Sequence, residues 1–155
     1  MPGIVLTTTI TASARRCFDL SLSVDAHTAS MARSGERIVD GIRSGVMERG
    51  DTVTWRARHF GAWFTMTSRI TELTAPTRFV DEQVSGPFAY WWHEHVFEER
   101  DGATVMTDRV EFASPLGPIG RLVDRLVLTR YMTRLLAQRN RWLADALPEV
   151  QRERP

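Results

Sequence analysis

Apolar residues recur at helical spacing near the end of the chain. After Gly120 no glycine or proline interrupts the pattern through Leu147, and the first break is Pro148. Such a stretch predicts one long helix, about 40 Å at 1.5 Å per residue. Its apolar residues form two stripes more than a quarter turn apart, so we expect a bend or break near Leu128 to Tyr131. The stripes are Ile119, Leu122, Val123, Leu126 and Val127, and then Leu135, Leu136, Trp142, Leu143, Ala146 and Leu147.

The chain before this helix is rich in short runs that alternate as strands do. Gly3–Ile10 predicts a first strand because Val, Ile and Thr dominate it. Ser13 can cap a short helix through Leu20, and Asp25 a second through about Met31. Turn signals then separate further predicted strands, which are Glu36–Met47, Thr52–Phe60, Trp63–Leu73, Arg78–Val84, Phe88–Glu99 and Thr104–Ala113. Consecutive hairpins before a long helix predict an α+β fold, a curved antiparallel sheet wrapped around the C-terminal helix.

The order of these elements, together with motifs along nearly the whole chain, resembles a known fold. The motifs are Phe18-Asp19-Leu20-Ser21, Trp55-x-Ala57-x-His59-Phe60-Gly61, Arg78-Phe79-Val80-Asp81-Glu82, His93-Glu94-His95-x-Phe97-Glu98 and Ser114-Pro115-Leu116-Gly117-Pro118. The chain resembles bacterial proteins of the START-like helix-grip (SRPBCC) superfamily, which includes pollen-allergen-type ligand binders and polyketide cyclases. The resemblance implies one internal cavity, which that superfamily uses for binding, transport, cyclisation, dehydration or resistance.

Strand alternation predicts which side chains line such a cavity, because successive residues point to opposite faces of a sheet. On Trp91–Phe97 we take Trp91, His93, His95 and Phe97 as inward, although Trp92 and Val96 would also suit a core. The same reasoning places Met106 and Asp108 on the inner face. The predicted ligand-binding residues are Trp55, His59, Met66, Phe79, Asp81, Trp91, His93, Phe97, Met106 and, from the helix, Arg139.

Arg139 stands at the centre of the second apolar stripe of the predicted helix. From there its guanidinium can reach the cavity and pair with Asp81, with Asp108 or with an acidic ligand. Alternatively, its aliphatic stem packs against the core while the guanidinium reaches water at the rim. The sequence leaves both arrangements open.

Two kinds of chemistry can be read from the inward polar residues. His93 and His95 could chelate a metal, with His59 or Asp108 completing the shell. However, no cysteine or third histidine stands at ligand spacing, and the resembled superfamily is not generally metal-dependent, so we expect neither metal nor organic cofactor. His95 and Asp108 form the candidate catalytic pair, because a carboxylate fixes the tautomer of an imidazole and raises its basicity. The alternative is a pair that only satisfies buried polar atoms.

The composition of the chain limits the partners and the location that we expect for this protein. The net charge of +1, from 20 basic and 19 acidic residues, gives no reason to expect nucleic acid or an anionic membrane as partner. The single cysteine, Cys17, cannot form an internal disulfide, and Met1 to Ile10 lack the features of a signal peptide, so we expect a cytoplasmic location. With 43% hydrophobic residues, residues 1–150 can form one domain, followed by a frayed tail at 151–155. The sequence leaves open whether the protein forms a homodimer.

These features predict a protein that binds a hydrophobic, aromatic or polycyclic small molecule in an internal cavity, with polar groups orienting one edge of it. The first alternative is a cofactor-independent cyclase, dehydratase or isomerase, in which the His95–Asp108 pair moves protons. The second is sequestration of a toxic metabolite to confer resistance, which is chemically a special case of binding.

Overall fold

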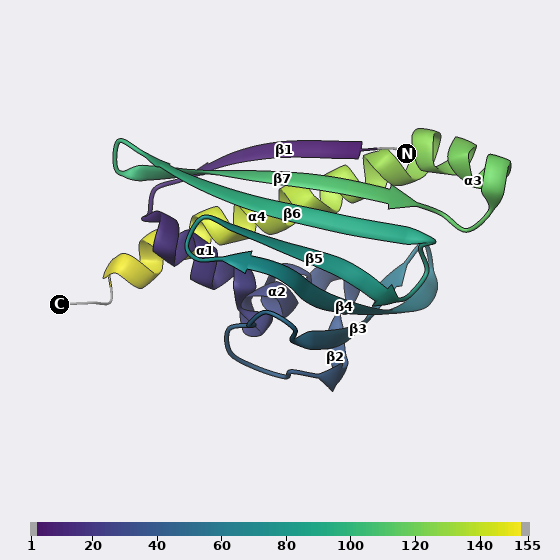
Figure 1. The fold of residues 1–155 in the computed structure, drawn as a ribbon, viewed down its shortest axis with the longest axis horizontal. Coiled ribbons are helices and arrows are strands. Elements are labelled where there is room, and N and C mark those ends of the chain that lie inside the picture. The colour runs from purple at the N-terminus through teal and green to yellow at the C-terminus, as the bar shows by residue number, and fades with distance from the viewer. Residues whose placement is uncertain (1–2, 153–155) are drawn as a thin grey trace.

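The fold is a curved antiparallel sheet laid across one long helix (Figure 1). The computed structural model describes residues 3–152. Its strands are β1 (Gly3–Ile10), β2 (Arg37–Gly41), β3 (Thr52–His59), β4 (Ala62–Thr74), β5 (Arg78–Ser85), β6 (Tyr90–Arg100) and β7 (Ala103–Ala113). Its helices are α1 (Ala14–Leu22), α2 (Val24–Ser30), a short 3-10 turn (Ala32–Ser34), α3 (Gly117–Val123), a π-helical turn (Asp124–Leu128) and α4 (Thr129–Arg152). The predicted α+β helix-grip architecture is confirmed.

The seven strands form a single sheet in the order β1-β7-β6-β5-β4-β3-β2. Every neighbouring pair is antiparallel, and from β2 to β7 each strand pairs with the next one along the chain. The exception is β1, which pairs with β7 across most of the chain, with Ile4 opposite Val110. Figure 1 shows α4 running along one face of this sheet, with α1 and α2 near one end.

Two predictions for the segment after β1 need correction. The strand expected over Glu36–Met47 forms only as β2, because glycine at positive φ (Gly41, 81°) ends it, and Val46 makes just an isolated bridge to Ser23. The cap of α2 is Ser23, not Asp25: the Ser23 side chain accepts a hydrogen bond from the Ala26 amide at 3.2 Å. Asp25 lies within the first turn of the helix.

The predicted interruption of the C-terminal helix is present as the π-helical turn Asp124–Leu128, which meets the expected Leu128 to Tyr131 at Leu128. A π turn adds a residue to one helical turn, so it offsets the faces before and after it. The helix does not end at Pro148, because α4 runs to Arg152. The fixed φ of proline is compatible with a helix, although the missing amide hydrogen and the contact of its ring with the preceding turn destabilise the helix there. Residues 153–155 of the predicted tail lie outside the described residues.

The apolar stripe predicted on the first part of this helix faces outward. Ile119, Leu122 and Leu126 are 71%, 58% and 58% exposed. The inward side of this segment is instead formed by Gly120 and Asp124, which lie one turn apart and are buried. The Asp124 carboxylate accepts a hydrogen bond from the Ser114 amide at 3.0 Å, and this contact fixes the rotation of the segment.

The core forms where strand alternation predicts it. Along β7 every second residue, including Met106, Asp108 and Phe112, is buried on the concave face. Phe18 of α1 closes this face at one end and contacts Phe79 and Phe97 edge to face, with ring centroids 5.7 and 5.6 Å apart. Among the described residues, no helix combines the length and the apolar character needed to cross a membrane.

Candidate functional site

A cavity of about 360 Å³ lies between the concave face of the sheet and the helices. Strands β3 to β6 supply one wall, and α1, α2 and α4 supply the other. Most of the wall is apolar. Most of the predicted site residues line it, namely Trp55, His59, Met66, Phe79, Asp81, Trp91, His93, His95 and Arg139.

Two predicted ligand contacts, Phe97 and Met106, do not line the cavity. Both are buried in the core beneath α1, where Phe97 meets Phe18 and the Ser21 hydroxyl donates to the Met106 sulfur at 3.7 Å. Alternation correctly assigned their face of the sheet. It could not show that α1 covers that part of the face. Asp108 also lies behind the cavity wall, completely buried.

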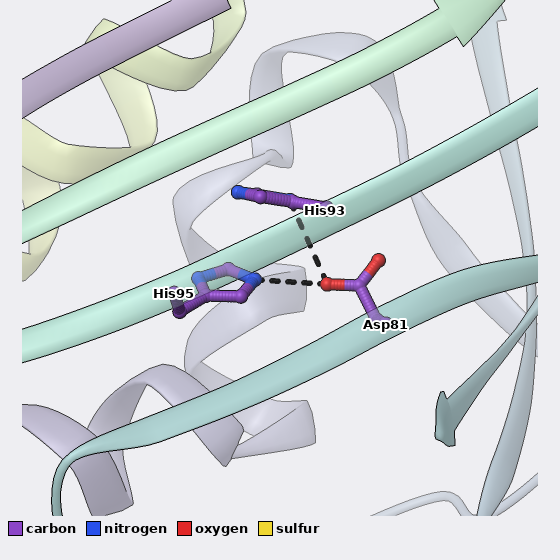
Figure 2. Close-up of side chains that lie close together, drawn as sticks. All are labelled: Asp81, His93 and His95. Atoms are coloured by element: carbon purple, nitrogen blue, oxygen red, sulfur yellow. Dashed lines mark hydrogen bonds and ion pairs between the residues drawn. The ribbon is translucent and has the colours of Figure 1, made fainter. Parts of the chain in front are cut away.

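Asp81, His93 and His95 meet at the polar end of the cavity (Figure 2). Asp81 extends from β5, and the two histidines extend from the same face of the neighbouring β6, where Asp81 is directly opposite His93. Asp81 Oδ2 lies 2.8 Å from His95 Nε2 and 3.6 Å from His93 Nδ1. The two imidazole rings lie over each other, with centroids 3.7 Å apart.

A second carboxylate, Asp108, lies on the other side of both imidazoles. Its Oδ1 is 2.8 Å from His93 Nε2 and 3.2 Å from His95 Nδ1. The predicted pairing of His95 with Asp108 is therefore present in the register of β6 and β7, but each histidine lies between two carboxylates. His95 makes its shorter contact with Asp81.

Arg139 and Asn140 of α4 complete the cluster behind Asp108. The Asn140 amide donates to Asp108 Oδ2 at 2.7 Å, and Arg139 Nη1 lies 3.6 Å from Asp108 Oδ1. Arg139 is only 4% exposed, so it pairs inside the protein and does not reach water at the rim. Sequence reasoning missed Asn140. The signal was available, because a polar residue beside Arg139 on a largely apolar helical face needs a buried partner.

The two carboxyl groups of the cluster stay ionised. Burial alone would raise the pKa of Asp81, but the charges and hydrogen bonds of His93 and His95 more than offset this and lower its pKa to about 2. The pKa of Asp108 is held well below its ordinary value against the same burial penalty, by the same two histidines. Burial lowers the pKa of His93, as does the neighbouring His95. At neutral pH Asp81 therefore presents an acceptor to the cavity.

The β3–β4 hairpin lies against α4 at another part of the cavity wall. His59 Nδ1 and the Tyr131 hydroxyl are 2.6 Å apart, and the Phe60 ring lies 4.3 Å from that of Tyr131. Phe60 has a positive φ of 53°, unusual for a bulky side chain, in the turn that Gly61 completes. Sequence analysis predicted His59 but not its partner Tyr131, because it assigned no residue of that turn of the helix to the cavity.

A further polar pair, His27 and Glu36, was also missed. His27 Nε2 lies 2.9 Å from Glu36 Oε1, and the imidazole ring lies over Trp55 with centroids 4.3 Å apart. Both residues line the cavity. Only the fold brings the last turn of α2 and the residue before β2 to the cavity, so no local pattern could indicate them.

The burial of His59 predicts a pH effect on stability. Burial lowers the pKa of His59 from its ordinary 6.5, partly opposed by Glu36. Because the unfolded chain then binds the proton more tightly, acidification below about pH 6.5 favours unfolding. Between about pH 7.5 and pH 5.5 we expect the wild-type protein to lose more unfolding free energy than His59→Gln does, measured by urea denaturation. Equal losses would show that His59 has the same proton affinity in both states.

Comparison with known proteins gives similarity in fold but not in sequence. No family model matches the chain, and no curated protein matches it. Among solved structures, the protein TTHA0849 from Thermus thermophilus is 16% identical with a TM-score of 0.72, over 94% of this chain and 99% of that one. A START superfamily protein from Mycobacterium smegmatis is 12% identical with a TM-score of 0.71, over 94% and 98%.

A third similar structure is the Zhui aromatase/cyclase from a Streptomyces species, which is 14% identical with a TM-score of 0.66, over 91% of this chain and 93% of that one. Identities this low carry no residue roles from one chain to another. The matches cover nearly the whole of each chain and agree with the element order and sheet topology described above. The chain therefore has the helix-grip fold of these structures, one of which is a START superfamily protein.

Proposed function

We propose that this protein binds a hydrophobic, aromatic small molecule that carries a hydroxyl group. The observation that carries the proposal is the carboxylate of Asp81 at the polar end of an otherwise largely apolar cavity of about 360 Å³. Its side chain keeps 19% of its surface exposed, against 6% or less for His93 and His95. Asp81 is therefore the group of this cluster most available to a ligand.

The size and lining of the cavity support the apolar part of this proposal. Cavities that bind small molecules commonly enclose about 300–1,000 Å³ and are lined by apolar and aromatic side chains with a few polar groups. Here Trp55, Phe79 and Trp91 supply flat apolar surface from three strands. Such walls suit a planar ring system, which loses little conformational freedom on binding.

The charges at the polar end support a hydroxyl as the ligand's polar group. Ionised Asp81 accepts hydrogen bonds and cannot donate them, so it favours a ligand donor and repels a ligand carboxylate. Arg139 also lines the cavity and carries only donors. A phenolic hydroxyl supplies the donor that Asp81 can accept.

The enzyme alternative, a cyclase, dehydratase or isomerase, draws support from the similar fold of the Zhui aromatase/cyclase. General-base catalysis by His95 requires a ring nitrogen that faces the substrate. Both nitrogens of His95 face carboxylates, at 2.8 and 3.2 Å. Binding, with sequestration of a toxic metabolite as a special case, therefore fits these contacts better than proton transfer by His95 and Asp108.

The test uses 2-naphthol and 2-methylnaphthalene, which differ by a hydroxyl in place of a methyl group. Quenching of tryptophan fluorescence measures the affinity of each in buffer containing EDTA. We expect the wild-type protein to bind 2-naphthol more tightly, and Asp81→Ala to weaken 2-naphthol binding by about 1–3 kcal/mol while leaving 2-methylnaphthalene little changed. Met66→Ala, which removes apolar wall, serves as the matched variant and should weaken both ligands alike.

If neither compound binds the wild-type protein, the cavity does not take aromatic molecules of this class and the proposal fails. If Asp81→Ala weakens both compounds equally, the carboxylate only maintains the fold, and its assigned role is wrong. Tight binding of 2-naphthoate, with affinity equal to that of 2-naphthol, would contradict the argument from the charge of Asp81.

A further inference from the structure

We propose that Asp81, His93 and His95 form a binding site for a divalent transition-metal ion, such as Zn²⁺ or Fe²⁺, at the polar end of the cavity. One donor atom from each residue lies within 4.8 Å of the other two. The proposal goes beyond small-molecule binding and does not depend on it. It also departs from the expectation drawn from the sequence, because the third ligand is an aspartate on a neighbouring strand.

The spacing of the donor atoms fits an ion. Zinc binds imidazole nitrogen and carboxylate oxygen at about 2.0–2.2 Å, which separates neighbouring ligand atoms by roughly 3.3 Å in a tetrahedral site. Asp81 Oδ2 is 2.8 Å from His95 Nε2 and 3.6 Å from His93 Nδ1, on either side of that value. In Figure 2 a ring nitrogen of His95 points at this Asp81 oxygen, and the His93 ring, seen edge-on, lies above the same oxygen.

The hydrogen bonds of the two histidines give an independent reason. His93 Nε2 pairs with Asp108 and His95 Nε2 pairs with Asp81, each at 2.8 Å, while His95 Nδ1 is buried without a hydrogen-bond partner among the described residues. A cation held by Asp81 and His95 Nε2 would place the His95 proton on Nδ1, which lies 3.2 Å from Asp108 Oδ1. The buried nitrogen would then carry its proton toward an acceptor.

Asp108 acts on the opposite side as a positioning residue. Metal-binding histidines commonly donate their other N–H to a carboxylate, which fixes the tautomer that leaves a lone pair for the metal. Asp108 Oδ1 lies 2.8 Å from His93 Nε2 and 3.2 Å from His95 Nδ1, so protons on these atoms leave His93 Nδ1 and His95 Nε2 free toward Asp81. Asn140 holds Asp108 in place at 2.7 Å.

The donor set and its surroundings indicate the class of metal. Two imidazoles and one carboxylate favour zinc or ferrous iron over magnesium or calcium, which prefer oxygen ligands alone. All three residues line the cavity, so a fourth coordination position can face a bound molecule. The charges of Asp81, Asp108 and Arg139 sum to −1, which a divalent ion turns into +1. A ligand hydroxyl, or its anion, would then bind the ion at the same end of the cavity.

The experiment is a metal titration of the untagged full chain after removal of metals with EDTA. Calorimetry with Zn²⁺ should show one equivalent bound. Bound Co²⁺ should show the strong visible absorption that is typical of a four-coordinate, tetrahedral site. Loss of a residue that hydrogen-bonds to a metal ligand typically weakens metal binding by roughly 10- to 100-fold. Asp81→Asn and His95→Gln remove metal ligands themselves, so each should weaken Zn²⁺ binding by more than that. Asp108→Asn should weaken it by about 10- to 100-fold. His27→Gln, which alters a histidine outside the cluster, should bind as the wild type does.

Two results overturn the proposal. One is a wild-type protein that binds less than one equivalent of both ions, and the other is a full equivalent that persists in Asp81→Asn and His95→Gln. If these variants do not fold, the wild-type protein decides the question: bound Co²⁺ must shift the ring resonances of His93 and His95 in the NMR spectrum far more than those of His27. Equal shifts refute the site. No organic ligand is present, so failure here leaves the proposed binding of hydroxylated aromatic molecules intact.

Discussion

Replacing Asp108 with alanine is expected to lower the free energy of unfolding by about 3–5 kcal/mol. This carboxylate is completely buried and accepts hydrogen bonds from His93 Nε2 at 2.8 Å and from Asn140 Nδ2 at 2.7 Å. Arg139 Nη1 lies 3.6 Å away, so the substitution leaves a buried guanidinium without the anion that balances its charge. Urea denaturation followed by tryptophan fluorescence, in buffer containing EDTA, measures the loss.

A surface aspartate provides the matched control. Asp19 on α1 forms an exposed ion pair with Arg15 at 3.7 Å, so Asp19→Ala should change stability by about 0.5 kcal/mol or less. The double variant Asp108→Leu with Arg139→Met removes both charges, and it should lose less than the sum of the two single losses. A loss below about 1 kcal/mol in Asp108→Ala would contradict the buried pairing.

Replacing Phe18 with alanine is also expected to lower the free energy of unfolding by about 3–5 kcal/mol, because it removes a buried ring and leaves a void in the core. The ring is 2% exposed and contacts Phe79 and Phe97, with centroids 5.7 and 5.6 Å apart. Phe79 in turn stacks on His95 with centroids 4.0 Å apart, so the void opens directly behind the cavity wall. We therefore expect weaker binding of 2-naphthol together with the loss of stability.

Phe60 provides the matched control, because Phe60→Ala makes the same substitution at an exposed position. It is 61% exposed at the turn between β3 and β4, so Phe60→Ala should cost about 1 kcal/mol or less. Comparable losses for the two variants would mean that the contact of α1 with the sheet is not part of the stable core. Unchanged 2-naphthol affinity in Phe18→Ala would show that the cavity wall keeps its shape without support from α1.

Patterns that repeat at the spacing of one strand or helix predicted this fold well. The alternation in β6 identified Trp91, His93 and His95 as inward, and all three line the cavity. The break in the helical stripe predicted a change in the C-terminal helix, which is the π turn before Thr129. Both predictions needed only the direction of each side chain relative to its own element.

Several contacts that depend on how elements lie against each other were not predicted. The contact of Asp81 with both histidines depends on the register in which β5 pairs with β6. On its other side β5 pairs with β4, and that pairing contains register shifts. Likewise, the stripe containing Ile119 and Leu122 predicted a buried face, but Gly120 and Asp124 bring the opposite side of α3 against the loop after β7. The order of polar and apolar side chains along one element does not determine the register of its neighbours or the rotation of a helix against them.

The pairing of β1 with β7 sets the order in which this molecule can assemble. Strands β3 to β7 join through consecutive turns, so they can pair soon after each is synthesised. β1 must wait for a partner roughly a hundred residues further along, since Ile4 lies opposite Val110. α4 follows later still. From this order we expect a nascent chain to hold an open sheet with its concave face in water, and the cavity to be the last part of the protein to form.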